Sequence, residues 1–290
     1  MKILSAIALI AREGSIRKAA EYLTISPSAL NRQLLSLEEE LGTQLFERSA
    51  SGVRLSTAGE IYHRHFLDQI AGFRRARETV AAMEGLRIGR VRLLVSADLA
   101  AGFAPAEVAR FREAHPGVAV AVTRVAHDGF AALLAAGEAD LALVVQPIFQ
   151  DGAETLAAAE APLVGVVPAP DDPAPLRAED FLDHDLILPP EGTGLRQLID
   201  LFFKQRRLDV RPLLEVEDPT PPARGARPTL QVRLKADVSP DWAERAGAAL
   251  RPLAGAPRAR IALARAEGRN LPVAASRLAA QLATRLPALE

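Results

Sequence analysis

The sequence predicts an α/β protein that opens with a small, mainly helical domain. Within the first 60 residues, apolar side chains recur at helical spacing in three short stretches. Beyond residue 90, short buried strands alternate with amphipathic helices, which is typical of a largely parallel sheet. A chain of 290 residues is long enough for about two domains, each with its own core.

Composition excludes several classes of protein. The chain has no cysteine, so it has no disulfide, zinc–thiolate site or thiol nucleophile. No apolar run approaches the roughly 20 residues that span a bilayer. Arg12 and Glu13 follow the short apolar start, which indicates a first helix rather than a signal peptide. We therefore expect a cytoplasmic protein with no membrane partner. The first 90 residues carry 13 basic and 10 acidic side chains, an excess too small to indicate nucleic-acid binding by itself.

The three opening helices have recognisable ends. The first ends near Gly14, and Ser15 can cap the second. Ser26 is a good N-cap for the third helix, because Pro27 follows at the first helical position. The apolar faces are Ile3, Ile7 and Ile10, then Ala19, Ala20 and Leu23, then Leu30, Leu34, Leu37 and Leu41 before Gly42. A tight break before the last of three short helices predicts a helix-turn-helix.

The third helix carries polar residues that suit DNA. In a helix-turn-helix its N-terminal end enters the major groove while the second helix braces it. Ser28, Asn31, Arg32 and Gln33 lie on its polar side. Asparagine and glutamine can pair with adenine, and arginine with guanine or phosphate. Helix spacing alone also allows a small structural bundle with a solvated polar face.

A short hairpin and a long helix follow. The stretches 45–48 and 53–55 are predicted strands around a Ser-Ala-Ser-Gly turn, with Arg48 and Arg54 beside it, so they form a wing. Thr57 and Glu60 match a capping box that opens a helix to about residue 86. Phe66, Phe73 and Val80 recur every seven residues, with Tyr62, Ala76 and Met83 between them. This stripe predicts a seam with a second copy of the chain, although packing on its own domain is the alternative.

The stretch "GSIRKAAEYLTISPSALNRQLLSLEEELGTQLFERSASGVRLSTAGE" resembles the winged helix-turn-helix of the LysR-type transcriptional regulators. The resemblance implies that promoter DNA is the partner, that long helices pair into dimers or tetramers, and that RNA polymerase is a further partner if the protein activates. The implied DNA-binding residues are Ser26, Pro27, Ser28, Asn31, Arg32, Gln33, Arg48 and Arg54. The family usually has Gln where this chain has Pro27, and Ser or Thr where it has Asn31, so operator preference does not carry over.

The remaining chain resembles the effector domain of the same family, which has two lobes like a periplasmic binding protein. The resemblance implies hinges near 145–148 and 215–218 and a small-molecule effector. The predicted domains are a winged helix-turn-helix at 1–57, a linker helix at 58–87 and an effector domain at 88–290, with lobe one at about 88–146 and 260–290 and lobe two at about 147–259.

Candidate effector residues lie where strands end and helices begin, because ligands of α/β folds bind there. They are Ser96, Asp98, Thr123, Gln146, Thr193 and Gly194. Asp98 disfavours a simple anion unless a cation offsets its charge.

Residues 218–244 depart from the family pattern. Four prolines, at 219, 221, 222 and 228, forbid a regular helix over most of 218–228. Either lobe two has diverged or the coding sequence is locally frame-shifted or degraded. If the segment is not packed, we expect it to be the least ordered part of the effector domain, with Trp242 at least partly exposed.

Enzyme chemistry has little support in the sequence. His63 and His65 stand two apart on a helix and face different sides, and His115 precedes a proline at a helix end. Phosphate-loop and nucleophile-elbow motifs are missing. We expect no catalytic residue, metal or cofactor. The alternative function is a cytosolic solute-binding module that no longer binds DNA or no longer senses an effector.

Overall fold

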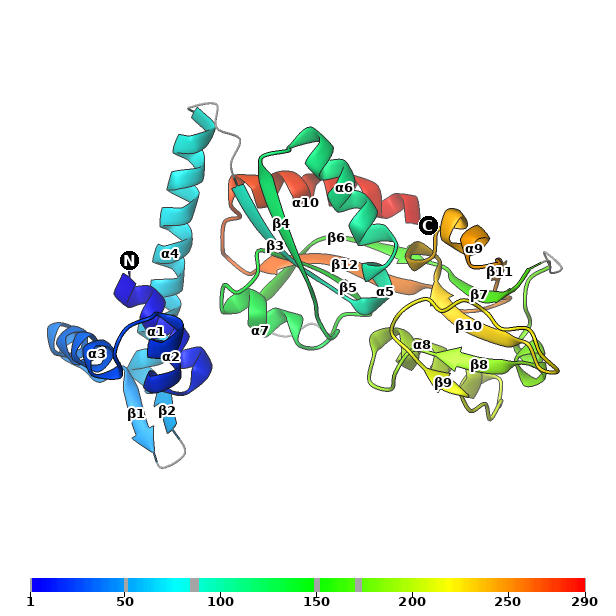
Figure 1. Ribbon diagram of the computed structural model, residues 1–290, viewed down its shortest axis with the longest axis horizontal. Helices are drawn as coiled ribbons and strands as arrows, with labels where there is room; N and C mark the ends of the chain where they lie inside the picture. Colours follow the sequence, from blue (N-terminus) through cyan, green and yellow to red (C-terminus); the bar gives the residue numbers. More distant parts are fainter. Residues whose placement is uncertain (1, 50–51, 84–88, 149–151, 170–173, 290) are drawn as a thin grey trace. The chain divides into compact units, whose positions relative to one another are not determined.

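The computed structural model describes residues 2–49, 52–83, 89–148, 152–169 and 174–289. The chain forms two compact units, Met1–Val80 and Ala81–Glu290, shown as ribbons in Figure 1. Within the described residues, no helix is long and apolar enough to cross a membrane.

The first unit contains three short helices, a hairpin and most of a long helix. The elements are α1 (Lys2–Glu13), α2 (Ile16–Tyr22), α3 (Pro27–Leu41), β1 (Phe46–Ser49), β2 (Gly52–Leu55) and α4 (Thr57–Met83). The antiparallel strands β1 and β2 form the wing. Helix α4 begins where predicted, but its first turn is capped by Ser56, whose Oγ accepts the Gly59 N–H at 2.9 Å, rather than by Thr57.

The core of this unit corrects the predicted dimer seam. Ile7, Ile10, Leu30, Leu34 and Leu45 are fully or almost fully buried. Phe66 of α4 is only 8% exposed and belongs to the same cluster, with Tyr62 packed beside it. Phe66 therefore stabilises its own domain, whereas Phe73 is 51% exposed. The side chains of Val80 and Met83 lie outside the described residues.

The second unit contains two five-stranded sheets, which define its lobes. In lobe one the strand order is β4-β3-β5-β12-β6, and in lobe two it is β11-β7-β10-β8-β9. The lobe one strands are β3 (Gly89–Val95), β4 (Val118–Arg124), β5 (Leu141–Val145), β6 (Ala153–Ala161) and β12 (Ala259–Ala266). The lobe two strands are β7 (Leu163–Pro168), β8 (Asp185–Leu188), β9 (Leu214–Glu215), β10 (Thr229–Leu234) and β11 (Ala248–Pro252).

Helices cover both faces of each sheet. In lobe one, α6 (Phe103–Ala114) and α10 (Val273–Arg285) pack on one face and α7 (Phe130–Ala135) on the other. In lobe two, α8 (Gly194–Gln205) and α9 (Pro240–Arg245) take opposite faces. Short α5 (Ala97–Ala100) follows β3, and 3₁₀ turns occur at Ala178–Asp183, Lys235–Asp237 and Leu286–Leu289.

The crossings between the lobes differ from the predicted hinges. Strand β6 pairs with β12 of lobe one, so the chain first changes sheets at Pro162 rather than at 145–148. It returns between β11 and β12, rather than at 215–218. The sequence offered little signal for β6, because its alanine-rich stretch resembles neither an alternating nor a β-branched strand.

Residues 229–245 are packed, so the condition under which low order was expected for 218–244 does not hold for this part of the segment. All six residues of β10 are buried at the centre of the lobe two sheet, and α9 covers that sheet with Trp242 half-buried. Residues 218–228 contain no helix, as the prolines predicted. Polar side chains of β10 hold this loop: Gln231 accepts from Thr220 N at 2.8 Å and Thr229 accepts from Ala223 N at 2.7 Å.

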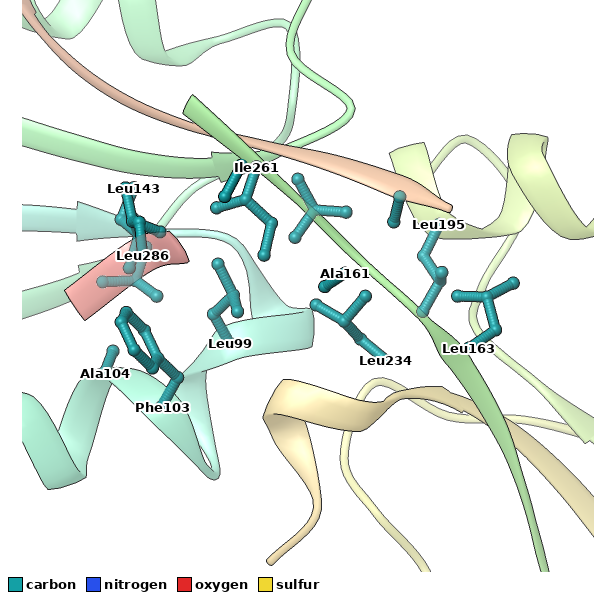
Figure 2. Close-up of a cluster of buried hydrophobic side chains, with 14 of the residues drawn as sticks. Leu99, Phe103, Ala104, Leu143, Ala161, Leu163, Leu195, Leu234, Ile261 and Leu286 are labelled. Carbon is teal, nitrogen blue, oxygen red and sulfur yellow. The ribbon is translucent and has the colours of Figure 1, made fainter. Parts of the chain in front are cut away.

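One hydrophobic core joins the two lobes. Leu99 and Ala161 from lobe one belong to the same buried cluster as Leu163, Leu195 and Leu234 from lobe two, and Figure 2 shows these side chains lying together. Gly102 makes this approach possible, because a Cβ there would lie 2.5 Å from the Ala236 carbonyl oxygen.

Candidate DNA interface and effector cavity

The turn between α2 and α3 is built as the sequence predicted. Ser15 Oγ accepts from Lys18 N at 3.3 Å, and Ser26 Oγ accepts from Ala29 N at 3.2 Å. Pro27 occupies the first turn of α3, where its missing N–H has no cost. Gly42 ends the helix with φ +67°, a left-handed conformation that glycine adopts readily.

The start of α3 presents a polar, exposed face. Ser28, Arg32 and Gln33 are exposed and Asn31 is half-buried. Ser26 and Pro27 are exposed beside them, and the Ser26 and Ser28 hydroxyls lie 3.2 Å apart. Leu30 and Leu34 anchor the opposite side of the helix in the core. The helix therefore offers its polar side chains to a partner from a fixed position.

An acidic residue near the C-terminal end of α3 holds the start of the wing by hydrogen bonds. Glu38 Oε1 accepts hydrogen bonds from the backbone N–H groups of Leu45 at 2.7 Å and Phe46 at 3.2 Å. This carboxylate thereby ties the C-terminal half of α3 to the first wing strand. The sequence did not indicate this role for Glu38.

Of the two predicted arginines of the wing, the structure describes the side chain of Arg54 but not that of Arg48. Arg54 on β2 is exposed and stands opposite Glu47 on β1. Arg48 stands opposite Val53 in the same ladder, and its side chain lies outside the described residues.

A cavity of about 210 Å³ lies between the lobes of the second unit. Its lobe one wall follows the ends of β3 and β4, and its lobe two wall is the start of α8 and the loop after β9. The lining residues are Ser96, Ala97, Asp98, Arg124, Val125, Ala126, His127, Gly192, Thr193, Gly194 and Glu217.

Four of the six predicted effector residues line this cavity. They are Ser96, Asp98, Thr193 and Gly194. Thr123 is exposed and Gln146 is engaged by lobe one, and neither lines the cavity. Gln146 exchanges two hydrogen bonds with the backbone of Arg260, its N donating at 2.7 Å and its Oε1 accepting at 3.2 Å.

Arg124, His127 and Glu217 also line the cavity and were not predicted from the sequence. The rule that selected Thr123, the end of a parallel strand, also covers Arg124 and His127, because β4 ends at Arg124. Glu217 follows β9, a strand of only two residues with weak sequence signal.

An ion pair joins the lobes beside the cavity. Arg124 Nη1 of lobe one donates to Glu217 Oε2 of lobe two at 3.1 Å, and its Nη2 donates to Asp218. The hydrogen bond to Asp218 contributes most to raising the pKa of the Arg124 guanidinium. This pair is roughly half-exposed, so salt in solution screens it.

Asp98 belongs to a buried charged cluster that also spans the lobes. Arg233 of β10 donates to Asp237, and Asp237 Oδ1 accepts from Ala101 N of lobe one at 3.1 Å. Burial raises the pKa of Asp98 to about 6, with nearby Arg233 lowering it and Asp237 raising it. The cavity thus has a carboxyl group that titrates close to neutral pH.

Together these features define a class: a DNA-binding protein with a winged helix-turn-helix, a long helix and a two-lobed sensing domain around a small cavity. Residues 1–60 match the bacterial regulatory helix-turn-helix protein, lysR family. Residues 84–287 match the LysR substrate binding domain. The chain belongs to the LysR family of transcriptional regulators, which are not enzymes.

Individual relatives support this assignment. The chain is 29% identical over 209 residues to the RuBisCO operon transcriptional regulator of Allochromatium vinosum, covering 70% of this chain and 68% of the relative. It is 29% identical over 197 residues to the regulator IlvY of Escherichia coli, covering 66% of each. The matched part thus spans about two thirds of these relatives.

Solved structures show the same fold along nearly the whole chain. A full-length OxyR variant from Pseudomonas aeruginosa aligns with a TM-score of 0.68 at 21% identity, covering 99% of this chain and 95% of that one. Full-length CbnR in complex with its target DNA aligns with a TM-score of 0.54 at 20% identity, covering 97% of each chain.

Proposed function

We propose that this LysR-type regulator reads its operator with the start of α3 and holds the DNA backbone with the wing. The observation that carries the proposal is the exposed polar face of α3, fixed by the Ser26 cap on one side and by Leu30 and Leu34 on the other. Ser28, Asn31 and Gln33 are the proposed base readers, and Arg32, Arg48 and Arg54 the proposed phosphate contacts.

Self-association completes the operator site. A LysR-type regulator that binds as a dimer places two recognition helices in successive major grooves. The exposed Phe73 on α4 supports pairing through that helix. If the protein activates a promoter, RNA polymerase would be a further partner. A regulator that binds promoter DNA would act in the cytoplasm, where the DNA is.

The effector is proposed to bind in the cavity between the lobes. Groups from both lobes line it, so a molecule bound there contacts both and can favour one arrangement of the lobes over another. Ser96, Asp98, Arg124, Thr193 and Gly194 are the proposed contacts.

Operator binding tests this function. Genomic footprinting of the full-length protein would first identify bound sites. Arg32→Ala should then weaken binding to any duplex and flatten the salt dependence by about one counterion, whereas Asn31→Ala should relax base preference by about 1–3 kcal/mol.

The matched control is Arg112→Ala, which removes an exposed arginine from α6 of the effector domain. Equal salt slopes for the Arg32 and Arg112 variants would contradict the assignment of α3. Failure of the wild-type protein to occupy any genomic site would favour the solute-binding alternative.

A further inference from the structure

The cavity between the lobes contains groups that attract a cation and groups that attract an anion. Asp98 and Glu217 line it, and so do Arg124 and the N-terminal end of α8 at Thr193 and Gly194. A helix of 12 residues concentrates partial positive charge at its first N–H groups. The two kinds of group occur on the walls of one small cavity, so they constrain the ligand together.

Asp98 provides the buried negative charge. Its side chain is only 4% exposed, and Arg233, the nearby cation, directs its described hydrogen bond to Asp237 instead. Among the described residues, the Asp98 carboxylate accepts a hydrogen bond from its own backbone N–H. A buried carboxylate with so few donors gains from a ligand that brings its own charged N–H groups.

Glu217 provides a second negative charge, which pairs with Arg124 and is still accessible to a ligand. It accepts from Arg124 at 3.1 Å while remaining about half-exposed. Arg124 also pairs with Asp218. If a ligand cation engages Glu217, Arg124 therefore keeps a carboxylate partner, and the contact between the lobes is retained.

The start of α8 provides the donors for an anion. Thr193 Oγ1 accepts from Arg196 N at 3.2 Å, while no described hydrogen bond uses the Gly194 N–H. A Cβ at Gly194 would lie 2.7 Å from the Val145 carbonyl oxygen, so glycine is what lets this helix end reach lobe one. Gly194 thereby forms part of the cavity wall.

We propose that the effector is a small amino-carboxylate compound of the amino-acid class. Its ammonium group binds Asp98 and Glu217, and its carboxylate binds the start of α8. This inference rests on the proposed function, in which the cavity is the effector site. A simple carboxylate would leave Asp98 and Glu217 without a cationic group from the ligand, and a simple amine would leave the donors of α8 without an anionic group.

The size of the cavity supports a small ligand. Its volume of about 210 Å³ lies below the roughly 300–1,000 Å³ that hold drug-sized molecules.

His127 forms part of the cavity wall and is 5% exposed. Its Nε2 lies 3.3 Å from Gln197 Nε2, and its buried Nδ1 has no partner among the described residues.

The test is calorimetric titration of the full-length protein with each of the common L-amino acids. Each binder is then compared with its deaminated acid and its decarboxylated amine. We expect at least one amino acid to bind, and expect the loss of either charged group to weaken binding by about tenfold or more.

Variants identify the contacts. Asp98→Asn and Glu217→Gln should each weaken amino-acid binding by about tenfold and leave binding of the deaminated acid unchanged or improved. Asp128→Asn is the matched control, because Asp128 is exposed and does not line the cavity. Glu217 is exposed, so its variant is informative even if Asp98→Asn folds poorly.

Several outcomes would overturn the proposal: no amino acid binds, the deaminated acid binds as tightly as its parent, or neither variant changes affinity. Binding of a simple carboxylate at this cavity with higher affinity than any amino acid would exclude the amino-acid class while leaving the proposed effector site intact. Failure of the wild-type protein to bind any operator would instead contradict the proposed function itself.

Discussion

Gly59 of α4 lies directly against the backbone carbonyl of Leu45 at the base of the wing. A Cβ at residue 59 would lie 1.9 Å from the Leu45 oxygen and 2.9 Å from its carbonyl carbon, and backbone atoms cannot yield as a flexible side chain can. Ser56 reinforces the junction, because its Oγ donates to Gln44 O at 2.6 Å and accepts from Gly59 N. The long helix and the wing therefore meet through a residue without a side chain.

Gly59→Ala should destabilise the N-terminal unit by about 1–3 kcal/mol through overpacking, although alanine by itself favours a helix by about 1 kcal/mol. Chemical denaturation of the full-length protein, followed by circular dichroism, measures the change. Gly129→Ala is the control, because a Cβ there would meet nothing within 4 Å. Equal effects of the two substitutions would show that the junction tolerates a side chain.

Phe73→Asp should convert the protein to monomers that bind an operator poorly. Phe73 is 51% exposed on α4, and a charge at that position opposes burial against a second copy. Light scattering measures the mass, with Gln69→Asp on an exposed position of the same helix as control. A Phe73→Asp protein that stays dimeric would place the seam elsewhere. Phe66→Asp is unsuitable, because Phe66 is part of the domain core.

Stability should depend on pH through Asp98. Burial raises its pKa from 3.8 to about 6, so the folded state holds this proton more tightly than the unfolded state. The contribution is complete below pH 3.8 and is lost as the pH rises through about 6, an effect on the order of 3 kcal/mol. Relative to Asp98→Asn, the wild-type protein should thus lose stability between pH 4 and pH 7.

Urea denaturation of both proteins at several pH values measures this difference. Arg233, Asp237 and Glu217 also act on Asp98, and they remain in the variant. Asp128→Asn should show no such pH-dependent difference, because Asp128 is exposed. A constant gap between wild type and the Asp98 variant across this range would contradict the raised pKa.

Gln231→Ala should release the proline-rich loop at 218–228. The Gln231 amide is buried and bonds the backbone of Thr220 at 2.8 Å and of Asp218 at 3.1 Å. Its loss leaves these groups unpaired, at a cost of about 1–3 kcal/mol. Limited proteolysis should then cut the loop faster than in the wild type or in Arg224→Ala, an exposed control in the same loop. Unchanged cleavage would show that other contacts hold it.

The helical part of the fold was predictable because its signals are local. Ser15, Ser26, Pro27 and Gly42 mark helix ends by their own chemistry, and each does so in the structure. The cap at Ser56 was misplaced by one residue, since Thr57 beside it carries the same kind of hydroxyl.

Pairing between distant segments was harder to predict. Strand β10 follows four prolines and contains the polar residues Gln231 and Arg233. Only the tertiary structure shows that Gln231 accepts a hydrogen bond from the proline-rich loop and that Arg233 donates one to Asp237. For the cavity, the rule of strand ends indicated the right edge of the sheet but selected Thr123 instead of its neighbour Arg124. Thr123 does not line the cavity and Arg124 does, because adjacent strand residues point to opposite faces.

The order of strands in lobe one has a consequence for synthesis on the ribosome. Strand β12 lies between β5 and β6, so β6 has no partner in the sheet until residues 259–266 have emerged. All of lobe two, from β7 to β11, is translated before that point. Lobe two can therefore complete its sheet first. Until β12 is made, the sheet of lobe one has an unpaired edge at β5 that is exposed to chaperones and to other nascent chains.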